Sequence, residues 1–226
     1  MWGKAMVRFR VLLALVLALL IGAGVARAGP WPREQGRFFL STTSTLGAAN
    51  GWRPQQTEYY AEYGLRPRLT IGAALSTSWR VDYADLFLRW HPLDLPQGLV
   101  FGVTSGVRYV PYSIAPYQPF VAVEAGRGMA LGGGNLWTQA GVRLYAARVP
   151  WGTELATDWS SQVGYARGRW LVMMGATHFR SRQVAITRLR PAIGLRLMDR
   201  FRLVAEAVIP PGGRVDAVRI GLWSEF

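Results

Sequence analysis

Three polar residues in the C-terminal half of the chain could together perform hydrolysis. The chain has two histidines, and one of them, His178, falls close to Asp158 and Ser160 if the segments 155–165 and 170–179 pair as neighbouring antiparallel strands. A serine nucleophile needs a histidine base that a third polar group holds in place. These residue types therefore outline a candidate catalytic site for cleaving a lipid ester near one end of the two strands.

Other features of the sequence argue against an enzyme. The apolar pattern of 170–179 has two possible phases, so that His178 can face either side of its strand. An enzyme that hydrolyses the esters of bilayer lipids needs its serine on the lipid-facing side to meet the acyl chains, whereas Ser160 lies on the predicted polar face. The chain contains no cysteine, and its histidines and carboxylates show no metal-binding spacing. We therefore expect no cofactor and no metal, and we treat lipid hydrolysis as the alternative function.

The segments that carry these residues alternate between apolar and polar side chains with a period of two, which is typical of β-strands. In 69–80, for example, Leu69, Ile71 and Leu75 share one face, and small or polar residues share the other. An even number of antiparallel strands can close into an up-and-down barrel. The alternating segments number twelve, with the approximate bounds 36–45, 57–65, 69–80, 83–91, 99–108, 119–126, 136–145, 155–165, 170–179, 189–197, 201–209 and 215–226.

Two regions fit the alternation poorly and leave ten strands possible. The glycine-rich segment 126–135 has no clear phase, and in 184–191 the apolar pattern shifts before Pro191. Because proline cannot donate a ladder hydrogen bond, we predict a long loop over 184–191. Long connections are also predicted at 46–56, 109–118 and 146–154, and brief ones at 66–68, 166–169 and 198–200.

The residues on the two faces indicate which side of the barrel meets lipid. A soluble β-sandwich would also alternate, with its apolar face inward. Here the polar face of the strands carries small residues and charges of both signs. Large aromatic residues lie near the strand ends, as in the interfacial girdles of a membrane barrel. We therefore predict an all-β, closed antiparallel transmembrane barrel. Trp79 and Trp159 would mark one membrane interface, and Tyr63, Trp90, Tyr165 and Trp170 would mark the other.

The first 28 residues are typical of a secretory signal peptide. Lys4, Arg8 and Arg10 precede an apolar run from 11 to about 25, and the small-residue site Ala26-Arg27-Ala28 follows. The apolar run is shorter than the roughly 20 residues that a spanning helix needs. We predict cleavage after residue 28 and one barrel domain over 29–226.

The C-terminal segment carries a resemblance to a known class of protein. Val218, Ile220, Leu222 and Phe226 share one face of the last predicted strand. This segment resembles the terminal strand of bacterial outer-membrane β-barrel proteins, in which a final phenylalanine is the signal that the insertion machinery binds; Ser224 departs from the pattern, which usually has an aromatic or apolar residue there. The resemblance implies a location in the bacterial outer membrane, the barrel-insertion machinery as a partner and Phe226 as the insertion signal. In that membrane the brief turns would face the periplasm.

Sorting the charged residues by face gives a nearly neutral interior and basic edges. Removal of the signal peptide takes away four of the 26 cationic residues and none of the 13 acidic ones, which leaves a net charge of +9. A balanced interior favours ion pairs over strong anion selectivity, although a track of arginines along one wall with acids opposite stays open. The predicted inward charges are Arg37, Arg80, Arg89, Arg108, Arg143, Arg196, Arg202 and Arg219 against Glu58, Glu62, Asp85, Glu124, Asp158, Glu206 and Glu225.

The arginines of the outer loops suggest a lipid partner. Arginine binds phosphate with two parallel hydrogen bonds, so that contact with the phosphates of lipopolysaccharide is a natural role. Ordinary solvated loops in an arginine-rich composition are the alternative, and no nucleic-acid partner is expected of an exported barrel. The arginines in question are Arg53, Arg148, Arg180, Arg182, Arg188, Arg190 and Arg214.

These patterns predict a membrane barrel that either offers a narrow pathway to small solutes or serves as a structural or surface component. Lipid hydrolysis near the outer rim, around His178, is the alternative from another functional class.

Overall fold

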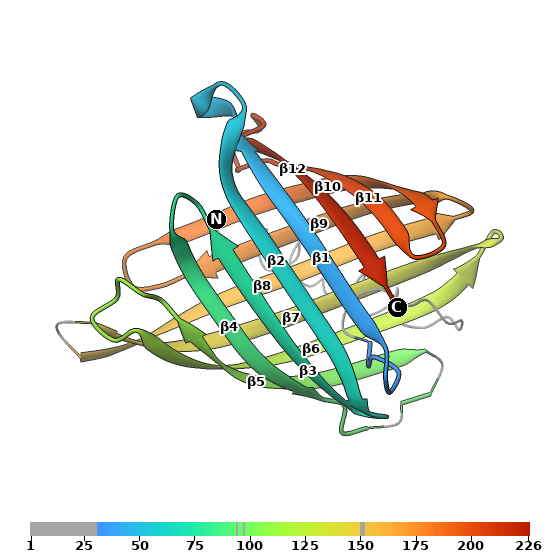
Figure 1. Cartoon of the computed structure of the whole chain (residues 1–226), viewed down its shortest axis with the longest axis horizontal. Coiled ribbons are helices and arrows are strands. Elements are labelled where there is room, and N and C mark those ends of the chain that lie inside the picture. Colours follow the sequence, from blue (N-terminus) through green and yellow to red (C-terminus); the bar gives the residue numbers. More distant parts are fainter. Residues whose placement is uncertain (1–30, 94, 97, 150–151) are drawn as a thin grey trace, which may run out of the picture.

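The computed structural model describes residues 31–226 except 94, 97, 150 and 151. The predicted signal peptide therefore lies outside the described residues. Within them, twelve strands form a closed barrel, and strands that follow one another along the chain pair side by side (Figure 1). This confirms the predicted all-β barrel with twelve rather than ten strands. No helix in this part of the chain is long and apolar enough to cross a membrane.

The strands vary in length from 8 to 16 residues, and the short 3-10 helix η1 (Ala48–Asn50) follows the first of them. Their bounds are β1 Phe38–Gly47, β2 Arg53–Arg66, β3 Leu69–Thr77, β4 Val81–Trp90, β5 Leu99–Tyr109, β6 Tyr117–Leu131, β7 Gly134–Val149, β8 Gly152–Arg167, β9 Trp170–Arg180, β10 Ala185–Met198, β11 Phe201–Val208 and β12 Ala217–Glu225.

The barrel closes where β1 meets β12. The two strands are antiparallel, and their register runs from Phe39 opposite Glu225 to Gly47 opposite Ala217. Beyond the ladder, the backbone of Phe226 exchanges two hydrogen bonds with Phe38, at 2.9 and 3.0 Å. Figure 1 shows the blue β1 beside the red β12. Every strand thus has two neighbours, which leaves no open sheet edge and satisfies the backbone as a bilayer demands.

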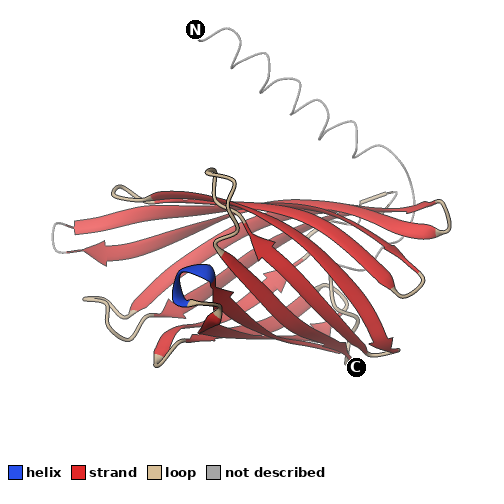
Figure 2. Ribbon diagram, turned by 90° about the horizontal axis from the view of Figure 1, so that it is seen from above, coloured by secondary structure: helices blue, strands red, loops and turns tan. Residues whose placement is uncertain are grey.

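The outer surface of the barrel is apolar. Outward side chains such as Leu86 and Val172 are each 55% exposed, and Trp90 and Trp170 stand at strand ends on the same surface. A soluble protein rarely leaves such a continuous apolar band in water, whereas a bilayer buries it. Figure 2 shows the closed wall of strands, with η1 at one rim of the barrel.

Several predicted loops are strand instead. The predicted loop 46–56 is too long, because η1 and the start of β2 occupy most of it. The predicted loop 146–154 is also too long, because β7 continues to Val149 and β8 begins at Gly152. On the periplasmic side the turns predicted at 66–68, 166–169 and 198–200 are brief, and residues 91–98 separate β4 from β5, close to the gap of 92–98 that the predicted strand bounds leave. The glycine-rich segment 126–135 is a hairpin whose turn residues Gly132 and Gly133 have φ of +54° and +75°, values that favour glycine.

The long loop predicted over 184–191 is wrong, because Pro191 lies inside β10. On one side Pro191 pairs with Met174 of β9 without a register shift. On the other side Leu189 and Ile209 exchange two backbone hydrogen bonds, and the β11 ladder resumes at Ala192. The missing proline N–H therefore interrupts only the β10–β11 ladder, and the strand continues because its other ladder is intact.

Candidate functional site

Charged side chains in the lumen form ion pairs with one another, several of them between strands that are not neighbours in the barrel. Glu62 of β2 lies at the centre of the first group, and its side chain is only 1% exposed. Its carboxylate accepts a hydrogen bond from Tyr60 and pairs with Arg89 Nη1 of β4 at 2.5 Å. Arg89 Nε also lies 3.0 Å from Glu124 Oε2 of β6. This group therefore links β2, β4 and β6 across the lumen-facing side of the wall.

A second group centres on Asp85 of β4, which is also buried. Arg108 of β5 binds both oxygens of Asp85 at 2.7 Å, a bidentate arrangement that fixes the guanidinium plane. Arg143 of β7 reaches the same carboxylate at 3.4 Å. The guanidinium of Arg108 also lies over the rings of Tyr83 and Tyr145, at 4.0 and 4.7 Å from their centroids. Two cations thus share one buried acid, with aromatic faces around them.

A third group joins the C-terminal strands to β2. Arg219 of β12 pairs with Glu58 of β2 and, at 3.1 Å, with Glu206 of β11. Arg190 of β10 donates to the same Glu206 at 2.8 Å. Arg190 was predicted on the outer rim, and this prediction is wrong. The apolar pattern shifts phase just before Pro191, so that the pattern did not indicate an inward side chain at 190.

Aromatic rings fill part of the interior beside these ion pairs. Phe87, Phe120, Tyr145 and Ala156 form one buried cluster, against which Tyr60 of β2 and Phe179 of β9 pack. Inward glycines make room for the rings, because a Cβ on Gly72 would lie 2.2 Å from the ring of Phe87. The cluster narrows the lumen, which is consistent with a pathway for small molecules only.

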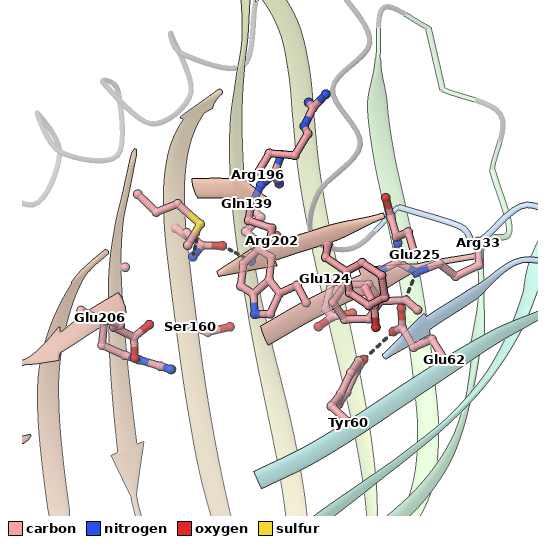
Figure 3. A pocket seen from close by; sticks show the side chains of 18 of the residues that line it. Arg33, Tyr60, Glu62, Glu124, Gln139, Ser160, Arg196, Arg202, Glu206 and Glu225 are labelled. Carbon is pink, nitrogen blue, oxygen red and sulfur yellow. Dashed lines mark hydrogen bonds and ion pairs between the residues drawn. The ribbon is translucent and has the colours of Figure 1, made fainter. Parts of the chain in front are cut away.

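A cavity of about 530 Å³ occupies the space that the ion pairs and rings leave. It reaches from the middle of the barrel to residues Asp199 and Arg200 of the β10–β11 turn. Figure 3 shows Arg33, Glu62 and Tyr60 on one side of this cavity and Glu206 on another. Its polar lining also includes Glu124, Gln139, Ser160, Gln162, Arg196 and Arg202.

The β10–β11 wall of the cavity carries excess positive charge. Arg196 and Arg202 are direct partners across the two strands, and both line the cavity. Neither makes an ion pair within the part of the chain that the structure describes, and Arg202 Nε is buried there without a hydrogen-bond partner. Because like charges placed opposite each other destabilise a sheet, this pair is a structural cost that contact with anions would offset.

Two predicted inward arginines lie elsewhere. Arg80 is in the β3–β4 turn, exposed, with its guanidinium 4.5 Å from the ring centroid of Trp79 and 3.9 Å from that of Tyr112. Arg37 precedes β1 and is exposed, with Glu34 at 3.7 Å. Both predictions are wrong for the same reason: the alternation was continued past the end of the strand, where it no longer fixes a face.

The three candidate catalytic residues are not brought together. Thr177 lines the cavity and Phe179 packs into the interior cluster, so that His178 between them faces outward. Its Nδ1 lies 2.8 Å from Thr187 Oγ1 of β10. Ser160 lines the cavity, and Asp158 lies opposite Arg143 on the inward face. Base and nucleophile are therefore on opposite sides of the wall, an arrangement that cannot transfer a proton directly between them.

Metal ligands are also missing from the described residues, which hold no group of three or more histidine, cysteine or acidic side chains able to bind a metal ion.

Two lumen residues that precede the first strand were not predicted from the sequence. Trp31 is 9% exposed and belongs to an interior apolar cluster, and Arg33 lines the cavity. Their only signal in the sequence is a bulky aromatic and a cation just after the predicted cleavage site. No strand pattern assigns such residues to a face.

Comparison with known proteins places this fold among outer-membrane β-barrels. No family model matches the sequence, and neither does any curated protein. Among solved structures, the KdgM porin is similar with a TM-score of 0.62 at 5% identity, covering 84% of this chain and 99% of that one. The NanC porin is similar with a TM-score of 0.59 at 9% identity, covering 84% and 98%.

An outer-membrane channel from Pseudomonas putida F1 gives a TM-score of 0.50 at 11% identity, covering 89% of this chain and 99% of that one. Identities this low establish a shared fold only. The chain therefore has the fold of bacterial outer-membrane β-barrels that include channels and porins, and the predicted outer-membrane class is confirmed at that level.

Proposed function

We propose that this protein is a narrow channel of the bacterial outer membrane for small polar solutes, exported there by its first 28 residues in a Gram-negative cell. The observation that carries the proposal is the 530 Å³ cavity inside a closed barrel, lined by charged and amide side chains. Such a lining replaces the hydrogen bonds that a polar solute loses with water. The channel and porin names of the similar structures support the same function.

The charge on the cavity wall favours solutes that carry carboxylates. Arg196 and Arg202 lack ion-pair partners among the described residues, whereas the acids Glu62 and Glu124 on the facing strands pair with Arg89. The free cationic charge is therefore on the β10–β11 wall, and a passing anion can bind there. One similar structure is a KdgM porin in complex with disordered oligogalacturonate, which supports an acidic solute class for this chain.

Conductance in planar bilayers tests this function. The purified protein is expected to give discrete openings, with a reversal potential in a KCl gradient that shows a modest preference for anions. Changing both Arg196→Glu and Arg202→Glu should shift the reversal potential toward cation preference, while Arg214→Glu in the β11–β12 loop should leave it unchanged. Absence of discrete openings would refute the channel, and an unchanged reversal potential in the double variant would refute the role of this wall.

We also propose lipopolysaccharide as a lipid partner. Exposed arginines lie at the strand ends and loops opposite the chain's C-terminus, among them Arg53, Arg180, Arg182, Arg188 and Arg214. The geometry of arginine suits bidentate contact with lipid phosphates. The barrel-insertion machinery is the second partner, and Phe226 is proposed as the residue that it binds.

A further inference from the structure

A short segment before the barrel folds back into the lumen. Residues 31–35, called the strap below, precede β1 and lie outside every strand. Trp31 belongs to a buried cluster with Trp137, Leu171 and Met173, and Trp223 of β12 packs against the same cluster. These partners lie on β7, β9 and β12, in the halves of those strands that are closer to the rim where the chain ends. The indole therefore occupies lumen space at the mouth from which the cavity opens.

Arg33 fixes the strap to two acids. Its Nε lies 2.6 Å from Glu62 Oε2, and its Nη1 lies 2.9 Å from Glu225 Oε1. Its guanidinium also lies 4.5 Å from the ring centroid of Phe39. Arg33 lines the cavity and is held by acids of β2 and β12, whereas Trp31 shares its cluster with residues of β7 and β9, so that the strap extends from one part of the lumen wall to another.

Gly36 marks the point at which the strap can turn. Its φ of +81° is in the left-handed region, which costs glycine little and other residues more. Its N–H donates to Gly64 O at 2.9 Å, and Gly64 N–H donates to Arg37 O at 3.1 Å. A Cβ on Gly64 would lie 2.1 Å from Glu34 O, so that only glycine at 64 lets the strap pass this close to β2. The fold thus provides a hinge and a recess for the strap.

We propose that the strap is a gate at the periplasmic mouth, closed when Trp31 is docked and opened by rotation of the strap about Gly36. The proposal rests on the channel function above and adds to it the part that moves.

The contacts of Glu62 show why the strap can leave without disrupting the barrel. After Arg33 departs, Glu62 keeps Arg89 and Tyr60 as partners, so that no buried charge is left alone. The second acid, Glu225, has a side chain that is 60% exposed, and water replaces its lost partner. No ladder bond of β1–β12 depends on residues 31–35. Opening is therefore a local event, independent of global unfolding.

The docked state is favoured because release exposes apolar surface. The indole of Trp31 and the cluster around Trp137 and Leu171 would both meet water when the strap swings out. Substitutions that remove this apolar contact should therefore shift the gate toward its open state.

Single-channel recording of strap variants tests the gate. Trp31→Ala and Arg33→Ala in the full chain should raise the mean current at least about twofold, through a larger conductance or longer openings. Gln35→Ala is the matched control, because Gln35 is an exposed residue of the same strap, and its current should equal that of the unmodified protein. A gel mobility that differs between unboiled and boiled samples confirms that each variant is folded.

A reversible lock gives a second, independent readout. Arg33 N lies 3.4 Å from Thr70 Oγ1, so that the two residues are neighbours, and the chain has no cysteine of its own. Arg33→Cys with Thr70→Cys is therefore the candidate pair for a single disulfide, and loss of both free thiols on oxidation confirms the bond before recording. Oxidised protein should conduct at the low level, and reduction should raise the current to that of Arg33→Ala. Equal currents in all conducting variants, before and after reduction, would refute the gate alone. If no protein conducts, the channel and its gate are both wrong.

Discussion

At the scale of single residues, the buried carboxylate of Glu62 is the centre of the lumen network. Three polar groups from three parts of the chain converge on it: Tyr60, Arg89 and Arg33. A charge this deeply buried is tolerated only because its partners compensate for lost hydration. Two of these partners, Tyr60 and Arg89, belong to strands of the barrel wall, whereas the third, Arg33, belongs to the strap that we propose can move away.

Removing the charge of Glu62 should destabilise the barrel strongly. Among the described residues, Glu62→Gln leaves the buried Arg89 with Glu124 as its one acidic partner, and we expect the free energy of unfolding in micelles to fall by about 3 kcal/mol, as for a broken buried ion pair. The matched variant Glu225→Gln alters an exposed partner of Arg33 and should cost less than about 1 kcal/mol. Urea-unfolding curves of the two variants measure the difference, and equal losses would contradict the central role given to Glu62.

At the scale of strands, the alternation of side chains predicted the strands themselves but not all their ends. Inside the bilayer one face meets lipid and the other the lumen, so that the period of two is strict in segments such as 69–77. Beyond the bilayer both faces meet water, and the pattern fades in the outer parts of β7 and β8 although the ladder continues. Loops were therefore predicted where hydrogen-bonded strand exists.

The interior residues followed from the same pattern wherever a strand's phase was clear. Glu62 and Asp85 are examples, and both are buried in the lumen. Arg190 was misplaced because Pro191 suggested a loop, and proline's effect depends on which neighbouring strand its missing N–H would have faced. Trp31 and Arg33 could not be placed from sequence, since their positions depend on contacts with residues far away in the chain.

The interrupted β10–β11 ladder gives a prediction at this scale. Pro191→Val supplies the absent N–H opposite β11 and keeps an apolar side chain toward lipid, so that the barrel should gain about 1 kcal/mol of stability. Ile193→Val, on the same face two residues further on, changes no hydrogen bond and serves as the control. Thermal or urea unfolding in micelles measures both variants. A Pro191→Val barrel no more stable than the unmodified one would show that the strand is not continuous there.

At the scale of the whole molecule, the apolar band faces outward and the charges face a narrow lumen. The closed ladder excludes lipid from the interior, and the three ion-pair groups together with the aromatic cluster restrict the space to a cavity of about 530 Å³. The strap reduces the mouth of that cavity further. The interior is therefore narrow, as the proposed gated passage requires, and does not form a wide pore.

The measurement that tests this most directly is the current through a barrel with one cysteine in the cavity. Ser160 lines the cavity, and Val172 lies on the lipid face, so that Ser160→Cys and Val172→Cys form a matched pair in a chain without native cysteine. A water-soluble, negatively charged thiol reagent should block most of the current through the Ser160→Cys barrel and leave the Val172→Cys barrel unchanged. Unaltered current through a fully modified Ser160→Cys barrel would contradict a solute pathway through this lumen.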